Sequence, residues 1–326
     1  MFHLRVIAPP DRSDAVRDLL LDEPGATHVV VWPGAALQPV GDVIGCDLAR
    51  EVASAVLGEL RDLGIERDGS IALEDLDVML SHSADAAELA APGDSADSVV
   101  WEEIEEATSE ESTLSVTFLA FLTVATMIAA CGVLLDNPIL IVGAMVVGPE
   151  FGPLAGLCVA AVQRHPRLAA RSGFALVVGF PVAMLLTMGF TLFMDALGLF
   201  DRGMLERPRP LTEFIFQPDW LSFWVAFLAG VAGILSLTSA KSGALIGVLI
   251  SVTTVPAAAN AAVAITYTDY SQAGGSLGQL GLNLVAIVIA GTLTLLVQRG
   301  LWSFNRDRHA RRPPSGKDRT GAPKSP

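Results

Sequence analysis

The sequence predicts an α-helical integral membrane protein with six transmembrane helices, preceded by an α+β domain of ferredoxin-like order. Three observations predict this fold class. The 326-residue chain is 52% hydrophobic, with a mean hydropathy of +0.51, which is too apolar for an ordinary soluble protein. Its second half contains six apolar segments, each long enough to cross a bilayer. Its first 111 residues hold six Lys or Arg and 25 Asp or Glu, so an acidic soluble domain precedes the membrane part.

Residues 1–80 are expected to fold as the soluble domain. Alternating or β-branched runs predict strands over 2–8, 26–32, 41–48 and 69–76, and helical periodicity predicts helices over 11–25 and 49–64. Asp11 or Ser13 is the candidate cap of the first helix, and Pro33-Gly34 should close the second strand. The order β-α-β-β-α-β is that of the ferredoxin-like sandwich. The domain is either a plain cytoplasmic appendage or a module for ligand sensing or oligomerisation.

The domain shows no catalytic pattern in its sequence. It has no phosphate-binding loop and no dinucleotide fingerprint. His3, His28 and His82 have no recognisable partners and are interpreted as solvated or satisfied side chains.

Residues 81–113 form an acidic linker. Its Ala, Gly and Pro residues predict a flexible start, and the apolar spacing after Ser98 predicts a short helix. Trp101 in that helix suits a membrane interface. The helix is either a lever joining the domain to the membrane part or a spacer.

The transmembrane domain is expected over 114–298, followed by a basic, disordered tail over 299–326. The six apolar segments are 114–135, 138–162, 171–197, 220–239, 243–266 and 280–298. Arg164, Arg167 and Arg171 flank the second loop, Lys241 lies in the fourth, and the tail is rich in Arg. Positive charge thus falls in alternate loops, which predicts cytoplasmic N- and C-termini. The first residues show no signal-peptide pattern.

The membrane segments contain an internal repeat at an offset of 107 residues. Leu114-Ser115 matches Leu221-Ser222, and Pro149 matches Pro256. Because each unit would hold three spans, the second unit should insert upside down relative to the first. Inverted three-helix repeats are a transporter architecture.

Two segments carry helix-breaking residues midway along their length. The first is VGPEFGP, residues 147–153, and the second is TTVPAAAN, residues 253–260. Proline removes a backbone donor and clashes with the preceding turn, so helices 2 and 5 should be broken near the bilayer midplane. Because freed backbone groups cannot face lipid, the broken ends should line a binding site.

The predicted site for a small solute or ion therefore combines both breaks. Its residues are Gly148, Pro149, Glu150, Gly152 and Pro153 from the first break, with Ser251, Thr253, Thr254, Pro256 and Asn260 from the second. A carboxylate at membrane depth marks a functional position by default. Glu150 is a candidate proton carrier, cation ligand or counter-charge for a basic substrate. The alternative is that it caps the second half-helix.

Other classes of site and partner are not predicted. Cys46, Cys131 and Cys158 are isolated and lack metal-ligand spacing, so no metal or cofactor is expected. No nucleophile–base pair accompanies Glu150, which argues against an enzyme. The acidic domain argues against nucleic-acid binding, and the basic tail is expected to contact anionic lipids. Gly-rich spans favour a homo-oligomer, a dimer or trimer.

The stretch NPILIVGAMVVGPEFGPLAGL, with VTTVPAAANAA and GDVIGCDLAREVASAVLGELRDLG, resembles the family called domain of unknown function 389. This is the uncharacterised hydrophobic domain family of prokaryotic membrane proteins, and the resemblance covers residues 1–298. It implies a multi-pass protein of the plasma (inner) membrane but brings no substrate. The residues that match the pattern are Gly143, Ala144, Met145, Pro149, Gly152, Pro153 and Pro256. Family members often carry an apolar residue at the position of Glu150.

Two functions are consistent with the sequence. The first is a transporter or channel for a small solute or ion, with its pathway between helices 2 and 5 and the cytoplasmic domain as regulator. The second is a membrane-anchored ligand sensor without transport activity.

Overall fold

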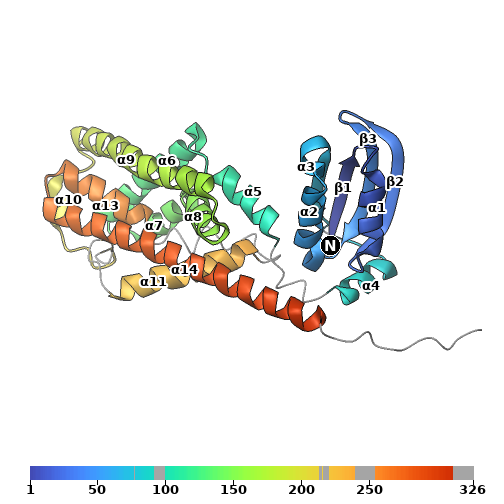
Figure 1. Cartoon of the computed structure of the whole chain (residues 1–326). Coiled ribbons are helices and arrows are strands. Elements are labelled where there is room, and N and C mark those ends of the chain that lie inside the picture. Colours follow the sequence, from blue (N-terminus) through green and yellow to red (C-terminus); the bar gives the residue numbers. More distant parts are fainter. Residues whose placement is uncertain (77, 92–99, 213–214, 216–219, 239–253, 311–326) are drawn as a thin grey trace, which may run out of the picture. The chain divides into compact units, whose positions relative to one another are not determined.

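The structure is a computed structural model of the whole chain (Figure 1). It describes every residue except 77, 92–99, 213–214, 216–219, 239–253 and 311–326, and for 301–310 it gives the helical backbone only. The chain forms two compact units, one of residues 1–98 with 298–326 and the other of residues 99–297. We call the first the sheet unit and the second the helical unit.

The sheet unit is built around four antiparallel strands in the order β2-β3-β1-β4 (Figure 1). Its elements are β1 (Phe2–Ala8), α1 (Ser13–Asp22), β2 (Ala26–Leu37), β3 (Val40–Leu48), α2 (Arg50–Asp62), α3 (Ile65–Asp68), β4 (Ser70–Asp75) and α4 (His82–Ala90). The predicted β-α-β-β-α-β order is present, with the one-turn α3 added before β4 and α4 after it.

Alternation along the strands makes the core of this unit. Leu4 and Val6 on β1 are fully buried, whereas Arg5 between them is exposed. Ile44 on β3 and Leu60 on α2 join the same apolar cluster. Because strand side chains alternate in direction, one sheet face packs on the helices and the other is left for polar groups.

Two local predictions in this unit were wrong. The cap position of α1 is Arg12, and no side chain caps the helix, so neither Asp11 nor Ser13 has the expected role. β2 does not end at Pro33-Gly34 but continues to Leu37 through a register shift between Trp32 and Ala36. The shift accommodates the turn-forming residues, because a bulge lets one strand gain residues relative to its partner.

The described residues of the linker are more ordered than their composition indicates. α4 occupies the stretch for which the sequence predicts a flexible start, and its Ala84 and Ala87 are buried. Small residues on one helix face allow such close packing, which overrides the turn-forming composition. α5 (Trp101–Glu111) confirms the expected short helix and buries Ile104 and Thr108.

The helical unit contains the apolar spans. Its elements are α5, α6 (Val116–Leu134), α7 (Pro138–Val147), α8 (Phe151–Gln163), α9 (Pro166–Ala196), α10 (Arg202–Glu206), α11 (Trp220–Thr238), α13 (Val255–Thr266) and α14 (Tyr270–Ala310), the last of which continues beyond the unit. Among described residues, α6, α9, α11 and α14 are long and apolar enough to cross a membrane. The bent pair α7 and α8 gives up to five spans. A sixth is not established, since half of the predicted fifth segment lies outside the described residues.

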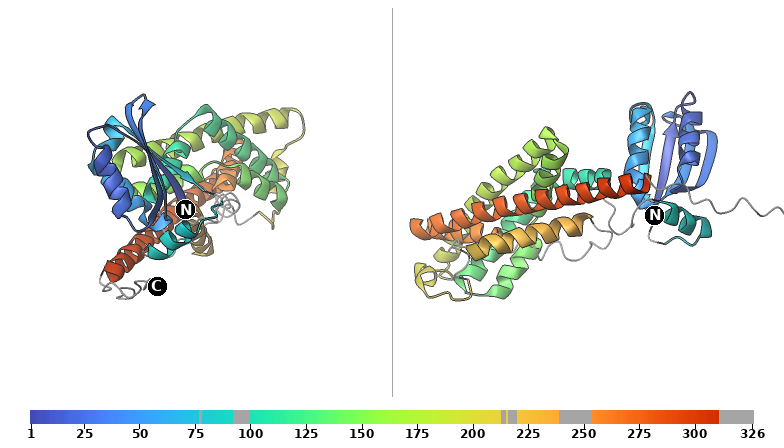
Figure 2. Two further views of the ribbon diagram at one scale, coloured as in Figure 1. Left: turned by 90° about the vertical axis from the view of Figure 1, so that its right-hand side faces the viewer. Right: turned by 60° about the horizontal axis from the view of Figure 1, so that its bottom comes forward.

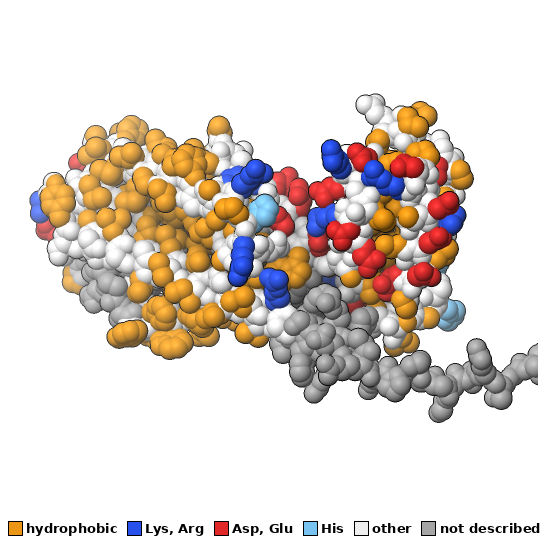
Figure 3. Space-filling model, viewed as in Figure 1, with side chains coloured by type: hydrophobic (Ala, Val, Ile, Leu, Met, Phe, Trp, Pro, Cys, Tyr) orange, Lys and Arg blue, Asp and Glu red, His pale blue; other side chains and the backbone are white. Residues whose placement is uncertain are grey.

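The surface of the helical unit is apolar. Val116, Ile139 and Val177 are each more than 70% exposed, and orange apolar side chains cover much of this unit in Figure 3. A contiguous apolar surface of this size on long helices indicates insertion into a membrane. α14 extends to Ala310, so the first residues of the predicted disordered tail are helical.

Three pairs of helix starts repeat at a constant spacing. α6 and α11 each have 19 residues and begin at Val116 and Trp220, which are 104 positions apart. The starts of α8 and α13, at 151 and 255, and of α9 and α14, at 166 and 270, differ by the same 104. The spacing is three residues shorter than the offset of 107 found in the sequence. α11 and α14 lie side by side (Figure 2), where Gly230 faces the backbone of Ile287.

Candidate functional site

The first predicted break is present between α7 and α8. α7 ends at Val147, α8 begins at Phe151, and the two helices meet at an angle of 55°. Pro149 lies in the connection, where its missing N–H and its ring exclude a continuous helix. Pro153 falls in the first turn of α8, a position at which proline is tolerated. The polar residue at this break is Glu150.

The Glu150 side chain is fully buried and reaches another helix. Its exposed fraction is 0%, and its Oε1 accepts a hydrogen bond of 2.7 Å from the hydroxyl of Thr254. The other oxygen, Oε2, accepts no hydrogen bond from any residue that the structure describes. A buried carboxylate oxygen without a partner is costly and calls for an explanation.

Glu150 and Thr254 are both helix cap residues, yet neither caps its own helix. Glu150 stands at the N-cap of α8 and Thr254 at the N-cap of α13, and neither side chain hydrogen-bonds to its first turn. The alternative prediction, that Glu150 caps the second half-helix, was therefore wrong. Its carboxylate crosses to α13, because the hydroxyl of Thr254 offers a donor beside the second helix terminus.

Gly148 makes room for this carboxylate. A Cβ at Gly148 would collide with Oε2 of Glu150 and lie 3.0 Å from Cγ2 of Val255. The carboxylate is therefore packed against the backbone of the break. Any larger residue at position 148 would displace it.

The second predicted break is described only from Thr254 onward. α13 begins at Val255 with Pro256 in its first turn, and both residues are buried. Ser251 and Thr253 lie outside the described residues. The predicted helix start beside Pro256 is therefore confirmed, whereas residues 239–253 before it lie outside the described residues.

Asn260 belongs to a different polar cluster from Glu150. It is fully buried on α13, where its Oδ1 accepts from Arg209 at 3.2 Å and its Nδ2 donates to Ser276 at 2.7 Å. It lies six residues beyond Thr254, which corresponds to about 9 Å along a helix. The two breaks thus bring Glu150 and Thr254 together, while Asn260 has its own partners.

Arg209 is the main polar residue that the sequence analysis did not select. It is 6% exposed and also donates to Oε1 of Gln272 at 2.9 Å. Burial lowers the pKa of its guanidinium, whereas the nearby carboxylates of Asp136 and Asp269 raise it. The sequence around Arg209 did not indicate that it is buried. It lies in a loop with acidic and basic residues, where the sequence pattern of a buried arginine is the same as that of a solvated one.

Gly152 supports the break by packing. A Cβ at Gly152 would collide with Glu111 at the end of α5, and the hydroxyl of Ser112 donates to the Gly152 carbonyl at 3.4 Å. Gly156, one turn later, faces Ser112 and Ser172 in the same way. The glycines of α8 therefore fix this helix against α5 and α9.

α8 and α13 lead away from the Glu150–Thr254 contact toward different elements of the helical unit. Beyond α8, His165 lies 3.7 Å from Glu105 on α5, which precedes α6 in the chain. α13 leads through Asn260 to Arg209, whose guanidinium also contacts the carbonyl of Val133 in the last turn of α6. The N-termini of both helices, which are the positive ends of their dipoles, therefore converge at the buried carboxylate.

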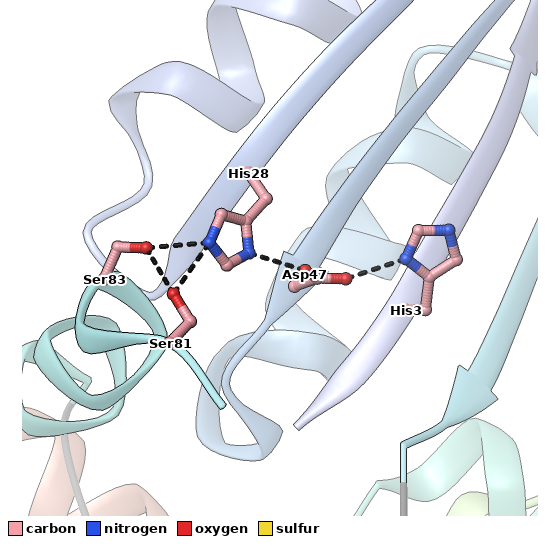
Figure 4. Close-up of polar contacts among 5 residues, drawn as sticks. All are labelled: His3, His28, Asp47, Ser81 and Ser83. Atoms are coloured by element: carbon pink, nitrogen blue, oxygen red, sulfur yellow. Dashed lines mark hydrogen bonds and ion pairs between the residues drawn. The ribbon is translucent and has the colours of Figure 1, made fainter. Parts of the chain in front are cut away.

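The sheet unit contains a second polar cluster (Figure 4). Asp47 on β3 lies 2.7 Å from Nδ1 of His3 on one side and 2.7 Å from Nδ1 of His28 on the other. Nε2 of His28 lies 2.9 Å from Ser81 and 2.8 Å from Ser83. The sequence shows no partner for His3 or His28, and the hydrogen bonds of both rings agree with their interpretation as satisfied side chains. Their partners are distant in the sequence, so the spacing of residues along the chain could not predict these contacts.

Comparisons with known proteins found a curated relative and a matching family model. The chain is 26% identical over 199 residues to an uncharacterized protein of Methanocaldococcus jannaschii. The match covers 59% of this chain and 58% of that protein, so the chain spans less than two thirds of the relative's length. No solved structure matches the chain. Residues 145–289, which include the Glu150–Thr254 contact, match the family model described as "Domain of unknown function (DUF389)".

Proposed function

We propose that the protein is a transporter or channel for a small solute or ion, with its site where the break between α7 and α8 meets the start of α13. The observation that carries the proposal is the second carboxylate oxygen of Glu150, which is buried without a hydrogen-bond donor among the described residues. An ionisable group inside a membrane domain is a functional position by default, because its desolvation has to be offset. A proton, a cation or a donor group of a solute would offset it.

The geometry around Glu150 supports this proposal. The N-termini of α8 and α13 meet at the carboxylate, and discontinuous helices whose ends meet near the midplane are the usual way in which transporters build a site. The two positive helix ends favour an anion between them, and Glu150 supplies that charge from within the chain. A cation or proton bound there would then depend on Glu150.

We further propose that the spans form two inverted three-helix repeats, with a ferredoxin-like regulatory domain ahead of them. The constant spacing of 104 between three pairs of helix starts supports the repeat. The proposal includes a homo-oligomer, a dimer or trimer, in contact with membrane lipids and without nucleic acid as a partner.

We also propose a prokaryotic plasma membrane location with both termini in the cytoplasm. A pocket of about 210 Å³ at the corner of α8 and α9 is lined by Glu105, Ser109, His165, Arg167, Leu168 and Arg171. Basic residues at this end of the helices suit the anionic cytoplasmic leaflet.

Flux measurements in proteoliposomes test the transport proposal. The wild type and Glu150→Gln would be compared for proton, Na⁺, K⁺ and chloride flux between pH 5 and 8. We expect Glu150→Gln to reduce proton or cation flux and to shift selectivity toward chloride, since two positive helix ends would remain without their counter-charge. Glu206→Gln, a change at an exposed carboxylate of the same unit, should behave like the wild type. Equal flux of every ion in Glu150→Gln and wild type would reject the role of Glu150.

A membrane-anchored sensor is the second candidate. It is favoured by the polar cluster of the sheet unit, which holds α4 against the sheet through His28. Absence of flux in the wild type, together with stabilisation of the full chain by a small polar ligand, would support the sensor and exclude the transporter.

A further inference from the structure

We propose that the sheet unit carries an acyl-transfer site in which Ser83 is the nucleophile and His28 its general base. The proposal does not depend on transport by the helical unit. It departs from the sequence-based expectation that no part of the chain is catalytic. It rests on four features of the cluster in Figure 4.

The first feature is the order of the groups. The hydroxyl oxygen of Ser83 lies 2.8 Å from Nε2 of His28, and Nδ1 of the same ring lies 2.7 Å from Oδ2 of Asp47. A hydroxyl, an imidazole and a carboxylate joined in this order form the arrangement by which serine is activated for attack on a carbonyl. Such an arrangement is recognised by geometry and not by the order of residues in the chain.

The second feature is the way in which Asp47 is held. Asp47 is 8% exposed, and its other oxygen lies 2.7 Å from Nδ1 of His3, its cross-strand partner on β1. An acceptor fixed opposite Nδ1 of His28 keeps the proton on that nitrogen and leaves Nε2 free to accept the proton of a hydroxyl. Asp47 is thus a positioning residue for His28.

The third feature is the backbone of His28. Its φ is +53°, in the left-handed region that residues with a side chain rarely adopt, and it lies at the register shift between Thr27 and Val30. Conformations of this kind are costly and gather at functional sites. Here the bulge directs the ring toward both Asp47 and the start of α4.

The fourth feature is the N-terminus of α4. Ser81 occupies the cap position, but its side chain makes no capping hydrogen bond and instead lies 2.9 Å from Nε2 of His28 and 2.8 Å from Ser83. The first N–H groups of a helix have no acceptor within the helix. The N–H groups of Ser83 and Ala84 are therefore available beside the nucleophile to stabilise a developing oxyanion.

The reaction balances without any co-reactant other than water. The oxygen of Ser83 bonds to the carbonyl carbon of an ester or thioester, and its proton passes to Nε2 of His28. The bond to the leaving alcohol or thiol then breaks, and the leaving group takes the electron pair of that bond and the proton from His28. Water releases the acid from the acyl-serine by the same relay.

The charge of the unit selects the class of substrate. Asp85 lies in the first turn of α4 and Glu88 one turn later, in a region where acidic residues greatly outnumber basic ones. Repulsion disfavours anionic substrates, so we infer a small neutral or cationic ester or thioester.

Acetylation of the full-length chain in detergent by p-nitrophenyl acetate tests the proposal. We expect a burst of one p-nitrophenolate per chain and an acetyl group located at Ser83 by peptide mass spectrometry. Ser83→Ala should abolish the burst, and His28→Gln should slow it by about 10²–10⁴-fold, the usual contribution of a general base. Imidazole added to His28→Ala should restore part of the rate, which a purely structural role of His28 would not allow.

His82→Ala is the matched control, because His82 is an exposed residue between Ser81 and Ser83 in the chain. It should acetylate at the wild-type rate, and all variants should share the wild-type thermal unfolding midpoint within about 3 °C. No acetyl group at Ser83 in the wild type would overturn the proposal. Equal rates in His28→Gln and wild type, or acetylation confined to His82, would overturn it as well.

Discussion

Glu150 and Thr254 occupy the N-cap positions of two different helices and hydrogen-bond to each other across 2.7 Å. They are 104 positions apart, the same spacing that separates the starts of α8 and α13. The contact therefore joins equivalent positions of the two proposed repeats. In an inverted repeat, equivalent residues meet where the pseudo-twofold axis passes between the units, which is also where transporters bind their substrates.

The contact between Glu150 and Thr254 should be energetically coupled. Thr254→Val removes the hydroxyl and nearly keeps the shape, leaving the buried carboxylate without its donor, at a cost of about 1–3 kcal/mol. In Glu150→Gln the charge is absent, so the same Thr254→Val change should cost less, by at least about 0.5 kcal/mol. A double-mutant cycle on unfolding in detergent measures the difference. Additive effects would show that the hydrogen bond contributes nothing to stability.

Gly148, directly after α7, should tolerate no side chain, in contrast to Gly143 within α7. Gly148→Ala places a Cβ against the Glu150 carboxylate and Val255, and we expect a loss of about 1–3 kcal/mol from overpacking. At Gly143 nothing lies within 4 Å of the corresponding Cβ, so Gly143→Ala should be neutral or stabilising by up to about 1 kcal/mol. Thermal unfolding of both variants in the same detergent checks the contrast. Equal destabilisation would contradict the packing around Glu150.

The break around Glu150 could be predicted from the sequence because its signals are local. Pro149 and Gly148 impose their backbone effects wherever they stand, and a carboxylate within an apolar run is conspicuous. The strand and helix order of the sheet unit was predictable for the same reason, since alternation and helical periodicity are properties of short windows.

The partners of these residues could not be predicted, because they depend on packing between distant segments. Asn260 pairs with Arg209 and not with the first break, and no window of sequence contains both. His28 and Ser83 are 55 positions apart, and a strained bulge brings them together. Burial also changes the role that a residue type can have. Arg209 lies in a loop whose charged sequence predicts solvent exposure, yet it is buried and holds two side chains by hydrogen bonds.

Arg209 should be essential for stability although it lies outside the predicted spans. Arg209→Gln leaves Asn260 and Gln272 without their charged donor in a buried setting, and we expect a loss of about 2–4 kcal/mol. Arg207→Gln, two residues earlier at an exposed position, should change stability by less than about 0.5 kcal/mol. Unfolding of both variants in detergent distinguishes them. An unchanged midpoint for Arg209→Gln would mean that the buried network is not formed.

Cys46 should be unreactive and should make the sheet unit sensitive to high pH. It is 1% exposed in the core, and burial, followed by the charge of Asp47, raises the pKa of its thiol to about 12. A thiol in the unfolded chain ionises near pH 8.5. The neutral thiol therefore stabilises the fold fully below about pH 8.5, and this contribution is lost as pH rises toward 12, by up to about 1.4 kcal/mol per pH unit.

Alkylation and unfolding between pH 7 and 10.5 measure both consequences for Cys46. Iodoacetamide at pH 9 should modify free glutathione rapidly and leave Cys46 of the folded chain unmodified, as peptide mass spectrometry would show, because only the thiolate reacts. Cys46→Ala cannot ionise, so the stability advantage of the wild type over this variant should shrink above about pH 8.5. Rapid alkylation of Cys46 in the folded chain, or a constant advantage across this range, would mean that the thiol is not held neutral in the core.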